Sequence, residues 1–329
     1  MDTALQIAAV VLGLAALVWS ADRFVDGASA TARLLGVPPL LVGMVVVGFG
    51  TSAPELTVSA FAAAGGNPSI ALGNAFGSNI CNIALILGVC AAIRATPFGR
   101  PAVVRETPLL LLATALAGFC LHDDALTRAE SFLMLGAFAT LLAVSSVAGV
   151  RERRAGGGEN AGSPAPAPTS SAAAAWRLAI GLAGLVLSSK ALVWGAVGVA
   201  RTLGVSDLLV GLTIVAVGTS LPELASSVAA ARKGESDIAV GNVIGSNLFD
   251  TLAVTGLAGA IAPIADVPEA VRTRDLPVTA AFTAALFLFG LVPLLRRRPA
   301  SLRRWQGALL LLGYLAYTAW LVRSETGGA

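Results

Sequence analysis

The chain has 329 residues, of which 56% are hydrophobic and only 12% are charged, and its net charge is +3. A soluble protein carries about 25% charged residues, so this chain lacks the polar surface that a water-soluble fold needs. The composition therefore excludes a soluble globular protein and indicates one that lies in a membrane. The small positive charge gives no reason to expect nucleic-acid binding.

Ten apolar stretches are long enough to cross a membrane as helices, which takes about 20 residues each. The first stretch has no basic region before it, so we expect a true span there and not a cleaved signal peptide. The sequence thus predicts an all-α polytopic membrane protein of ten transmembrane helices. In chain order the predicted spans are 4–20, 39–63, 69–92, 103–121, 127–149, 177–197, 207–231, 237–261, 275–294 and 303–322.

Basic residues indicate which loops face the cytoplasm. If the loops alternate between the two sides, those that follow odd-numbered spans hold sixteen Lys and Arg residues, and the other loops and tails hold five. Loops with such an excess normally face the cytoplasm. We therefore expect both termini outside the cell. The composition, rich in Ala, Gly and Arg, suggests a bacterial inner membrane.

One segment without apolar periodicity divides the spans into two groups of five. It reads RERRAGGGENAGSPAPAPTSS over residues 151–171, and its Gly, Pro, Ala and Ser content is typical of a disordered linker. We therefore expect a first five-helix half over 1–150, a cytoplasmic linker over 151–175 and a second half over 176–329.

The two halves are related by an internal repeat. Residues 13–88 align with residues 181–256 without a gap at an offset of 168, and polar residues match as well as apolar ones. Because five spans separate equivalent points, the second copy must cross the membrane in the opposite direction to the first. Inverted repeats with interrupted helices are the architecture of many secondary transporters.

The phrase GTSAPEL at 50–56 interrupts the second span. Pro54 has no N–H to donate to the carbonyl of Gly50, which predicts a broken helix. Broken backbone at membrane depth is tolerated only where it lines a cavity or is buried in protein. Thr51, Ser52 and Glu55 share one helical face at the break. The phrase GTSLPEL at 218–224 repeats the arrangement with Thr219, Ser220, Pro222 and Glu223.

The span after each broken helix carries a second phrase, GNAFGSNICN at 73–82 and GNVIGSNLFD at 241–250. Each places a serine four residues before a further oxygen ligand, Ser78 before Asn82 and Ser246 before Asp250. A lone serine in a membrane helix usually serves packing, but a carboxylate at mid-span is functional by default. Hydroxyl, amide and carboxylate oxygens without thiol or imidazole suit a hard cation such as calcium or sodium.

These phrases resemble the two alpha repeats of the calcium/cation antiporter superfamily, in its sodium/calcium exchanger branch of the prokaryotic type. The resemblance covers most of residues 36–92 and 204–260. It implies inverted five-helix halves with an ion site at mid-membrane, and exchange of sodium for calcium by alternating access. It implies transported ions and no cofactor. The ligands it implies are Thr51, Ser52, Glu55, Ser78, Asn82, Thr219, Ser220, Glu223, Ser246 and Asp250, with backbone carbonyls near Gly48 and Ala216.

Several alternatives stay open at this stage. Asp250 replaces the amide of its repeat mate Asn82, and potassium-dependent members of the superfamily carry aspartate here, so a proton/calcium or a potassium-dependent sodium/calcium antiporter is also compatible. A cation channel shares the polar chemistry, although the inverted broken helices favour a transporter. With one histidine and neither HExxH nor GxSxG, we expect no enzyme. We expect a monomer.

Overall fold

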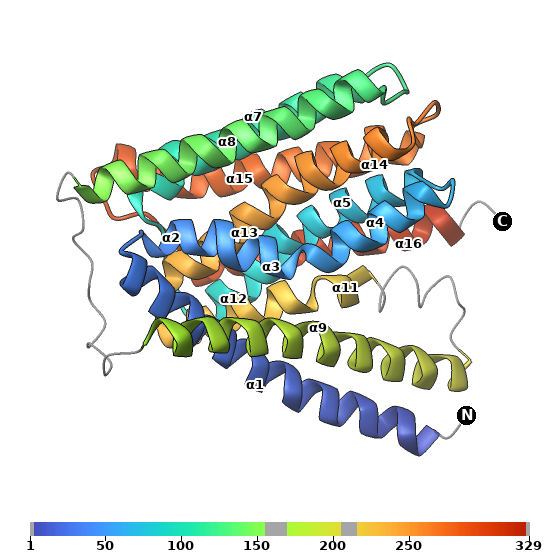
Figure 1. The fold of residues 1–329 in the computed structure, drawn as a ribbon. Coiled ribbons are helices and arrows are strands. Elements are labelled where there is room, and N and C mark those ends of the chain that lie inside the picture. The colour runs from blue at the N-terminus through green and yellow to red at the C-terminus, as the bar shows by residue number, and fades with distance from the viewer. Residues whose placement is uncertain (1–2, 155–169, 205–215, 327–329) are drawn as a thin grey trace.

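The structure is a computed structural model, and it describes residues 3–154, 170–204 and 216–326 of the chain. Within these ranges the chain is almost wholly helical (Figure 1). Eight helices are long and apolar enough to cross a membrane, and one bent pair of helices makes a ninth. The polytopic helical fold is therefore confirmed, but the count of ten is not, because the seventh predicted span, 207–231, lies partly outside the described residues.

The first half runs from α1 to α8 and contains three short π-helical turns, labelled η. Its elements are α1 (Thr3–Leu35), α2 (Pro39–Val42), η1 (Gly43–Gly48), α3 (Phe49–Thr51), α4 (Ala53–Ala64), α5 (Ser69–Ile80), η2 (Cys81–Ile86), α6 (Leu87–Ile93), β1 (Thr96–Pro97), η3 (Ala102–Glu106), α7 (Thr107–Cys120) and α8 (Arg128–Arg154).

The second half runs from α9 to α16 and repeats the order of the helices as far as it is described. Its elements are α9 (Ser171–Thr202), α11 (Ala216–Thr219), α12 (Leu221–Lys233), α13 (Ser236–Leu248), η5 (Phe249–Val254), α14 (Thr255–Ile261), η6 (Val271–Asp275), α15 (Leu276–Leu295), β2 (Ser301–Leu302) and α16 (Arg304–Thr326).

Helices extend into both ends of the predicted linker. Helix α8 continues to Arg154 and α9 begins at Ser171, where the hydroxyl of Ser170 caps the helix by accepting a hydrogen bond from Ala173 N–H. Both ends of the predicted 151–175 segment are therefore helical. Its middle, 155–169, lies outside the described residues.

Helices α1 and α9 pack against each other as a layer at one side of the molecule (Figure 1). They contain 33 and 32 residues, far more than the predicted spans 4–20 and 177–197. Glycines allow the close approach, since an added Cβ at Gly181 would collide with the backbone of Phe24.

Polar contacts join this layer to the broken helix of the second half. Lys233 Nζ, at the end of α12, donates to Asp26 Oδ1 and to the carbonyl of Asp22, both at 2.8 Å. Ser189 Oγ of α9 donates to the carbonyl of Gly218 at 3.0 Å. That carbonyl has lost its normal helical partner, because the residue four positions on is Pro222. The contacts therefore satisfy groups at both ends of the broken helix.

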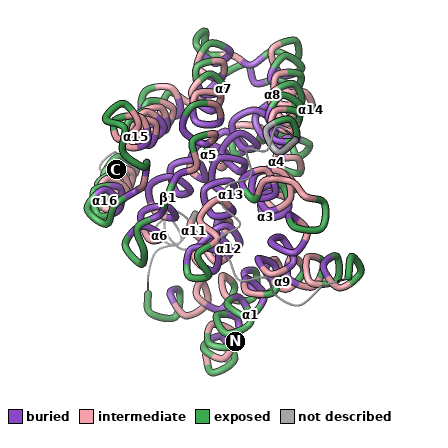
Figure 2. The backbone as a smooth tube through the Cα atoms, turned by 90° about the vertical axis from the view of Figure 1, so that its left-hand side faces the viewer, coloured by how far each residue is buried: buried purple, intermediate pink, exposed green. Residues whose placement is uncertain are grey.

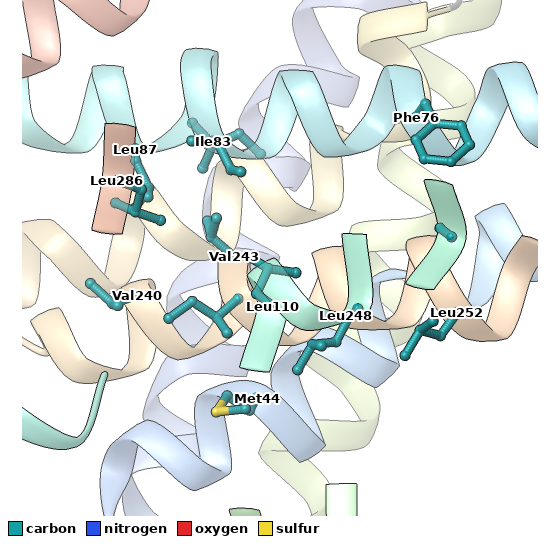
Figure 3. Packing of buried hydrophobic residues seen from close by; sticks show 14 of the residues in the cluster. Met44, Phe76, Ile83, Leu87, Leu110, Val240, Val243, Leu248, Leu252 and Leu286 are labelled. Atoms are coloured by element: carbon teal, nitrogen blue, oxygen red, sulfur yellow. The ribbon is translucent and has the colours of Figure 1, made fainter. Parts of the chain in front are cut away.

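The middle of the molecule is the most buried part, and Figure 2 shows the buried trace concentrated around α5 and α13. The main apolar core joins both halves, with Met44, Phe76 and Ile83 from the first and Val243 and Leu252 from the second (Figure 3). Large apolar side chains are exposed on the outer helices instead, which suits contact with lipid. Burial at the centre is what positions the site described below.

The segment before the first break lies directly against α13. An added Cβ at Gly241 would collide with the carbonyl of Leu40, and one at Gly245 with the carbonyl of Met44. Small residues that let backbones touch are the usual device for packing helices in a membrane. The glycines of the GNVIGSN phrase thus bring the polar residues of α13 next to the break at Ser52.

Short backbone pairings join loops of the first half to loops of the second half. Strands β1 and β2 pair antiparallel, with Thr96 opposite Leu302. A single bridge joins Leu126 to Ile264, and Ile264 is the repeat mate of Thr96 at the offset of 168. The inverted repeat is therefore visible in the loops as well as in the spans.

Candidate functional site

Two helix breaks lie at equivalent places in the halves. The bent pair turns by 45° between Thr51 and Ala53, and Ser52 leaves helical geometry with ψ near 1°. Ser220 has nearly the same backbone angles in the second half, before α12 begins. In both copies a proline follows two residues later, and its missing N–H prevents a continuous helix. The predicted breaks are confirmed.

Each break places a carboxylate in the first turn of a new helix. Glu55 lies in the first turn of α4 and Glu223 in the first turn of α12, and both are buried. The N-terminus of a helix carries partial positive charge, which favours an acidic side chain there. This partial charge offsets part of the cost of burying a carboxylate, but it does not neutralise it.

Side chains from the two halves contact each other at the breaks. Ser52 Oγ donates to Glu223 Oε1 at 3.2 Å, and Asn82 Nδ2 lies 3.5 Å from Asp250 Oδ2. The carboxyl group of Glu55 lies close to those of Glu223 and Asp250. Residues that are far apart in the sequence therefore meet at one buried place between the halves.

Many polar atoms at this place have no hydrogen-bond partner. Among the described residues, eleven buried side-chain N and O atoms lack a partner, and six of them belong to the predicted ligand set. An unsatisfied buried polar atom costs about 1–3 kcal/mol, so a concentration of them indicates a binding site. The six are Glu55 Oε2, Asn82 Oδ1, Ser220 Oγ, Glu223 Oε2, Ser246 Oγ and Asp250 Oδ1.

The site is rich in carboxyl groups and other oxygens. Of the Lys and Arg side chains that the structure describes, none forms an ion pair with Glu55, Glu223 or Asp250. In the same part of the chain, no three acidic, thiol or imidazole groups are placed to hold one ion by themselves. The oxygens offered to a cation are thus carboxylates together with hydroxyls and amides, a donor set that suits calcium and sodium.

The structure also describes three further predicted ligands. Ser78 on α5 and Thr51 are buried, and Thr219 at the end of α11 is half-buried. Thr51 Oγ1 lies 3.0 Å from the carbonyl of Val47 and 3.3 Å from that of Gly48. The Gly48 carbonyl also accepts the N–H of Ser52, so it is already engaged within its own helix.

For the backbone near Ala216, the structure gives helical geometry. Ala216 begins α11, three residues before Thr219. Residues 205–215 just before it lie outside the described residues.

The sequence analysis missed a set of asparagines inside the motifs that it quoted. Asn242 Nδ2 donates to Ser227 Oγ at 2.8 Å and lies 3.3 Å from the carbonyl of Glu223, while its Oδ1 accepts from Thr51 Oγ1 at 3.3 Å. Its repeat mate Asn74 lies 3.4 Å from the carbonyl of Glu55. Both copies of the repeat have asparagine at this position. That match was the signal in the sequence, because packing alone does not require the same amide in both copies.

A second missed feature is a pair of buried acid–arginine contacts. Arg105 Nε donates a hydrogen bond to Glu106 Oε1 at 2.6 Å in η3, and Arg274 Nε donates one to Asp275 Oδ1 at 2.7 Å in η6. A hydroxyl from the last helix of each half completes each contact. Ser145 donates to Glu106 at 2.6 Å, and Tyr317 donates to Asp275 at 3.0 Å. The sequence repeat thus extends in structure beyond the aligned segment.

Comparison with known proteins places this arrangement in context. A family model described as "Sodium/calcium exchanger protein" matches residues 5–147 and 173–323. The chain is 45% identical over 315 residues to the putative antiporter CaxA of Alkalimonas amylolytica, covering 94% of this chain and 96% of the relative. It is 33% identical over 355 residues to the sodium/calcium exchanger MaX1 of Methanosarcina acetivorans, covering 94% and 96%.

Solved structures give the same result. The fold matches a structure of the sodium-calcium exchanger NCX_Mj, soaked with zero Na+ and Ca2+, with a TM-score of 0.82 and 31% sequence identity. The match covers 97% of this chain and all of that structure. The likeness therefore extends over both halves and the place where they meet.

Proposed function

The chain belongs to the sodium/calcium exchanger family, and we propose that it exchanges sodium for calcium across the membrane by alternating access. The observation that supports this most directly is the cluster of buried oxygens without partners between the two broken helices. A bound cation would satisfy atoms that no protein group satisfies, and it would balance the buried carboxylates.

The proposed ligands divide by role. Glu55 and Glu223 supply charge from opposite halves, while Ser52, Ser220 and their neighbours supply neutral oxygens. Calcium takes six to eight oxygen ligands at about 2.3–2.6 Å, which this set can provide once it closes around the ion. We assign as ligands Thr51, Ser52, Glu55, Ser78, Asn82, Thr219, Ser220, Glu223, Ser246 and Asp250, with backbone oxygens near Gly48 and Ala216.

Alternating access follows from the inverted construction. Two halves of opposite direction with a site between them can open toward one side or the other by equivalent movements. The distribution of basic residues supports placing both termini outside a bacterial inner membrane and the predicted linker, 151–175, in the cytoplasm. The two five-helix halves would then be the functional units, and a monomer would contain a complete site.

Asp250 supports a second version of this function. Its Oδ1 has no partner, and it adds a third buried carboxylate to the site. With Glu55, Glu223 and Asp250 all ionised, three sodium ions would balance the charge, whereas one calcium ion would leave one charge over. A proton or a potassium ion could supply that charge, which would make the exchanger pH-dependent or potassium-dependent.

The test is calcium-45 uptake into proteoliposomes loaded with sodium, with potassium, or with a pH gradient alone. We expect uptake that requires internal sodium and stops when the sodium gradient is removed. Uptake that needs no counter-ion on the opposite side would indicate a channel. Uptake driven equally by a pH gradient alone would indicate proton/calcium exchange. The matched control is the Glu55→Gln variant, which should remain inactive under every loading.

A further inference from the structure

Two arginine-rich loops lie together at one end of the molecule. The first connects α6 to η3 and contains β1, and the second connects α15 to α16 and contains β2. The backbone joins them, because Phe98 N–H donates to the carbonyl of Ala300 at 2.9 Å beside the β1–β2 pair. The arginines of these loops, here called the arginine cluster, are Arg94, Arg100, Arg296, Arg297, Arg298, Arg303 and Arg304.

The β1–β2 pairing holds the two loops together. Thr96 lies opposite Leu302 and Pro97 opposite Ser301. Arginines that are about 200 residues apart in the sequence are therefore gathered at one end of the molecule. Gathering like charges is unfavourable unless anions lie beside them.

The described acidic groups near this end do not form ion pairs with the cluster. All seven arginines of the cluster are exposed, and in the described ranges none of them forms an ion pair. Asp237 Oδ1 lies beside Gly99 and forms no ion pair with the described arginines, and Glu235 Oε1 lies 3.9 Å from Arg33 Nη1. Among the described residues, no acidic group neutralises the cluster, so its positive charge can attract an anionic partner.

The cluster lies at the level of the membrane surface. Arg304 begins α16, the last span, and Arg296 follows the end of α15. Trp305, directly after Arg304, is 60% exposed and packs edge-to-face on Phe289 at 6.0 Å. Tryptophan is enriched where hydrocarbon meets the headgroups, because its ring is apolar and its N–H is polar.

We propose that the arginine cluster and Trp305 form a binding site for the phosphate group of an anionic phospholipid in the adjoining leaflet. Guanidinium groups bind phosphate oxygens through two parallel hydrogen bonds, which a lysine cannot do. Trp305 would lie beside the glycerol and upper acyl chain of the same lipid. The site is separate from the cation site and does not require exchange to occur.

The experiment measures lipid binding to the purified protein in detergent. Phosphatidylglycerol is titrated and its affinity is obtained from the rise of the unfolding midpoint, with phosphatidylcholine and inorganic phosphate as parallel titrations. For Arg298→Gln/Arg304→Gln we expect an affinity about 25-fold lower, since each arginine near an anionic surface contributes about fivefold. The matched control, Arg23→Gln/Arg151→Gln, removes two exposed arginines outside the cluster and should leave the affinity unchanged.

The outcomes separate the possibilities. Unchanged phosphatidylglycerol affinity in the cluster variant, or an equal loss in the control, would overturn the site. Equal stabilisation by phosphatidylcholine would overturn the requirement for negative charge, and equal stabilisation by inorganic phosphate would show a soluble-anion site instead of a lipid site. If Arg298→Gln/Arg304→Gln does not fold, Arg296→Gln/Arg297→Gln carries the same expectation.

Discussion

Ser52 and Ser220 are repeat mates and proposed ligands of one cation site, but their hydroxyl groups differ in their hydrogen-bond partners. Ser52 Oγ already donates to Glu223 Oε1 at 3.2 Å, and both side chains are at most 1% exposed. Ser220 Oγ is buried without a partner, and the thiol near it, that of Cys81, is a weak donor. Replacing each by alanine should therefore give different results, although both are proposed ligands.

The magnitudes follow from these contacts. A hydrogen bond to a charged group contributes about 1.5–3 kcal/mol, and we take a hydroxyl ligand to a cation as similar. Ser220→Ala removes a hydroxyl that contributes free energy only when calcium is bound. The calcium concentration for half-maximal exchange should therefore rise about ten- to hundredfold. Ser52→Ala removes a contact both from the calcium-bound and from the ion-free protein. The half-maximal calcium concentration should therefore rise about fivefold or less, and the ion-free protein should lose about 1.5–3 kcal/mol of stability.

Two assays check this contrast. Sodium-driven calcium-45 uptake at varied calcium gives the half-maximal concentration, and thermal unfolding without calcium or sodium gives the stability. Equal shifts of the half-maximal concentration in the two variants would refute the reasoning. An ion-free Ser52→Ala protein as stable as the wild type would refute it independently, since the bond to Glu223 would then contribute nothing.

The other predictions concern charge. Glu55→Gln and Glu223→Gln should each abolish sodium-driven calcium uptake without loss of folding, as judged by size-exclusion chromatography; near-normal uptake in either would contradict a shared site. Asp250→Asn should keep exchange but lose part of its dependence on pH between about 6 and 9, and any potassium dependence, measured by the same uptake; unchanged profiles in an active variant would contradict this. Ser145→Ala should lower the free energy of unfolding by about 1.5–3 kcal/mol, because Glu106 stays buried with one hydrogen-bond partner fewer. Thermal unfolding measures the loss, and an unchanged midpoint would show that the bond from Ser145 to Glu106 does not stabilise the fold.

Local chemistry made the helix breaks predictable. A proline removes one particular backbone donor, so Pro54 and Pro222 fix the position of each break without knowledge of the rest of the fold. The residues beside the breaks followed from helical spacing and from the repeat. The contacts between halves, such as Ser52 with Glu223, needed the structure, because spacing along a helix does not tell which residue of another helix lies opposite.

The lengths of α1 and α9 illustrate the opposite case. The predicted first and sixth spans ended at Ser20 and Val197 because apolar character fades near the charged residues. In the structure α1 continues through Asp22 and Asp26, and Lys233 of α12 forms ion pairs with both carboxylates. The π-helical turns likewise left no pattern in the sequence, because one extra residue in a turn changes neither composition nor hydropathy.

The attachment of the α1–α9 layer has a consequence for the direction of transport. Ser189 and Lys233 bind this layer to the broken helix of the second half, whereas their repeat mates, Ala21 and Gly65, have no polar side chain with which to do the same. A movement of the layer between positions related by the pseudo-two-fold axis of the repeats would break these bonds and form no equivalent ones. The two orientations would then differ in free energy, and such a carrier would rectify: with equal ion gradients it would run faster in one direction than in the other.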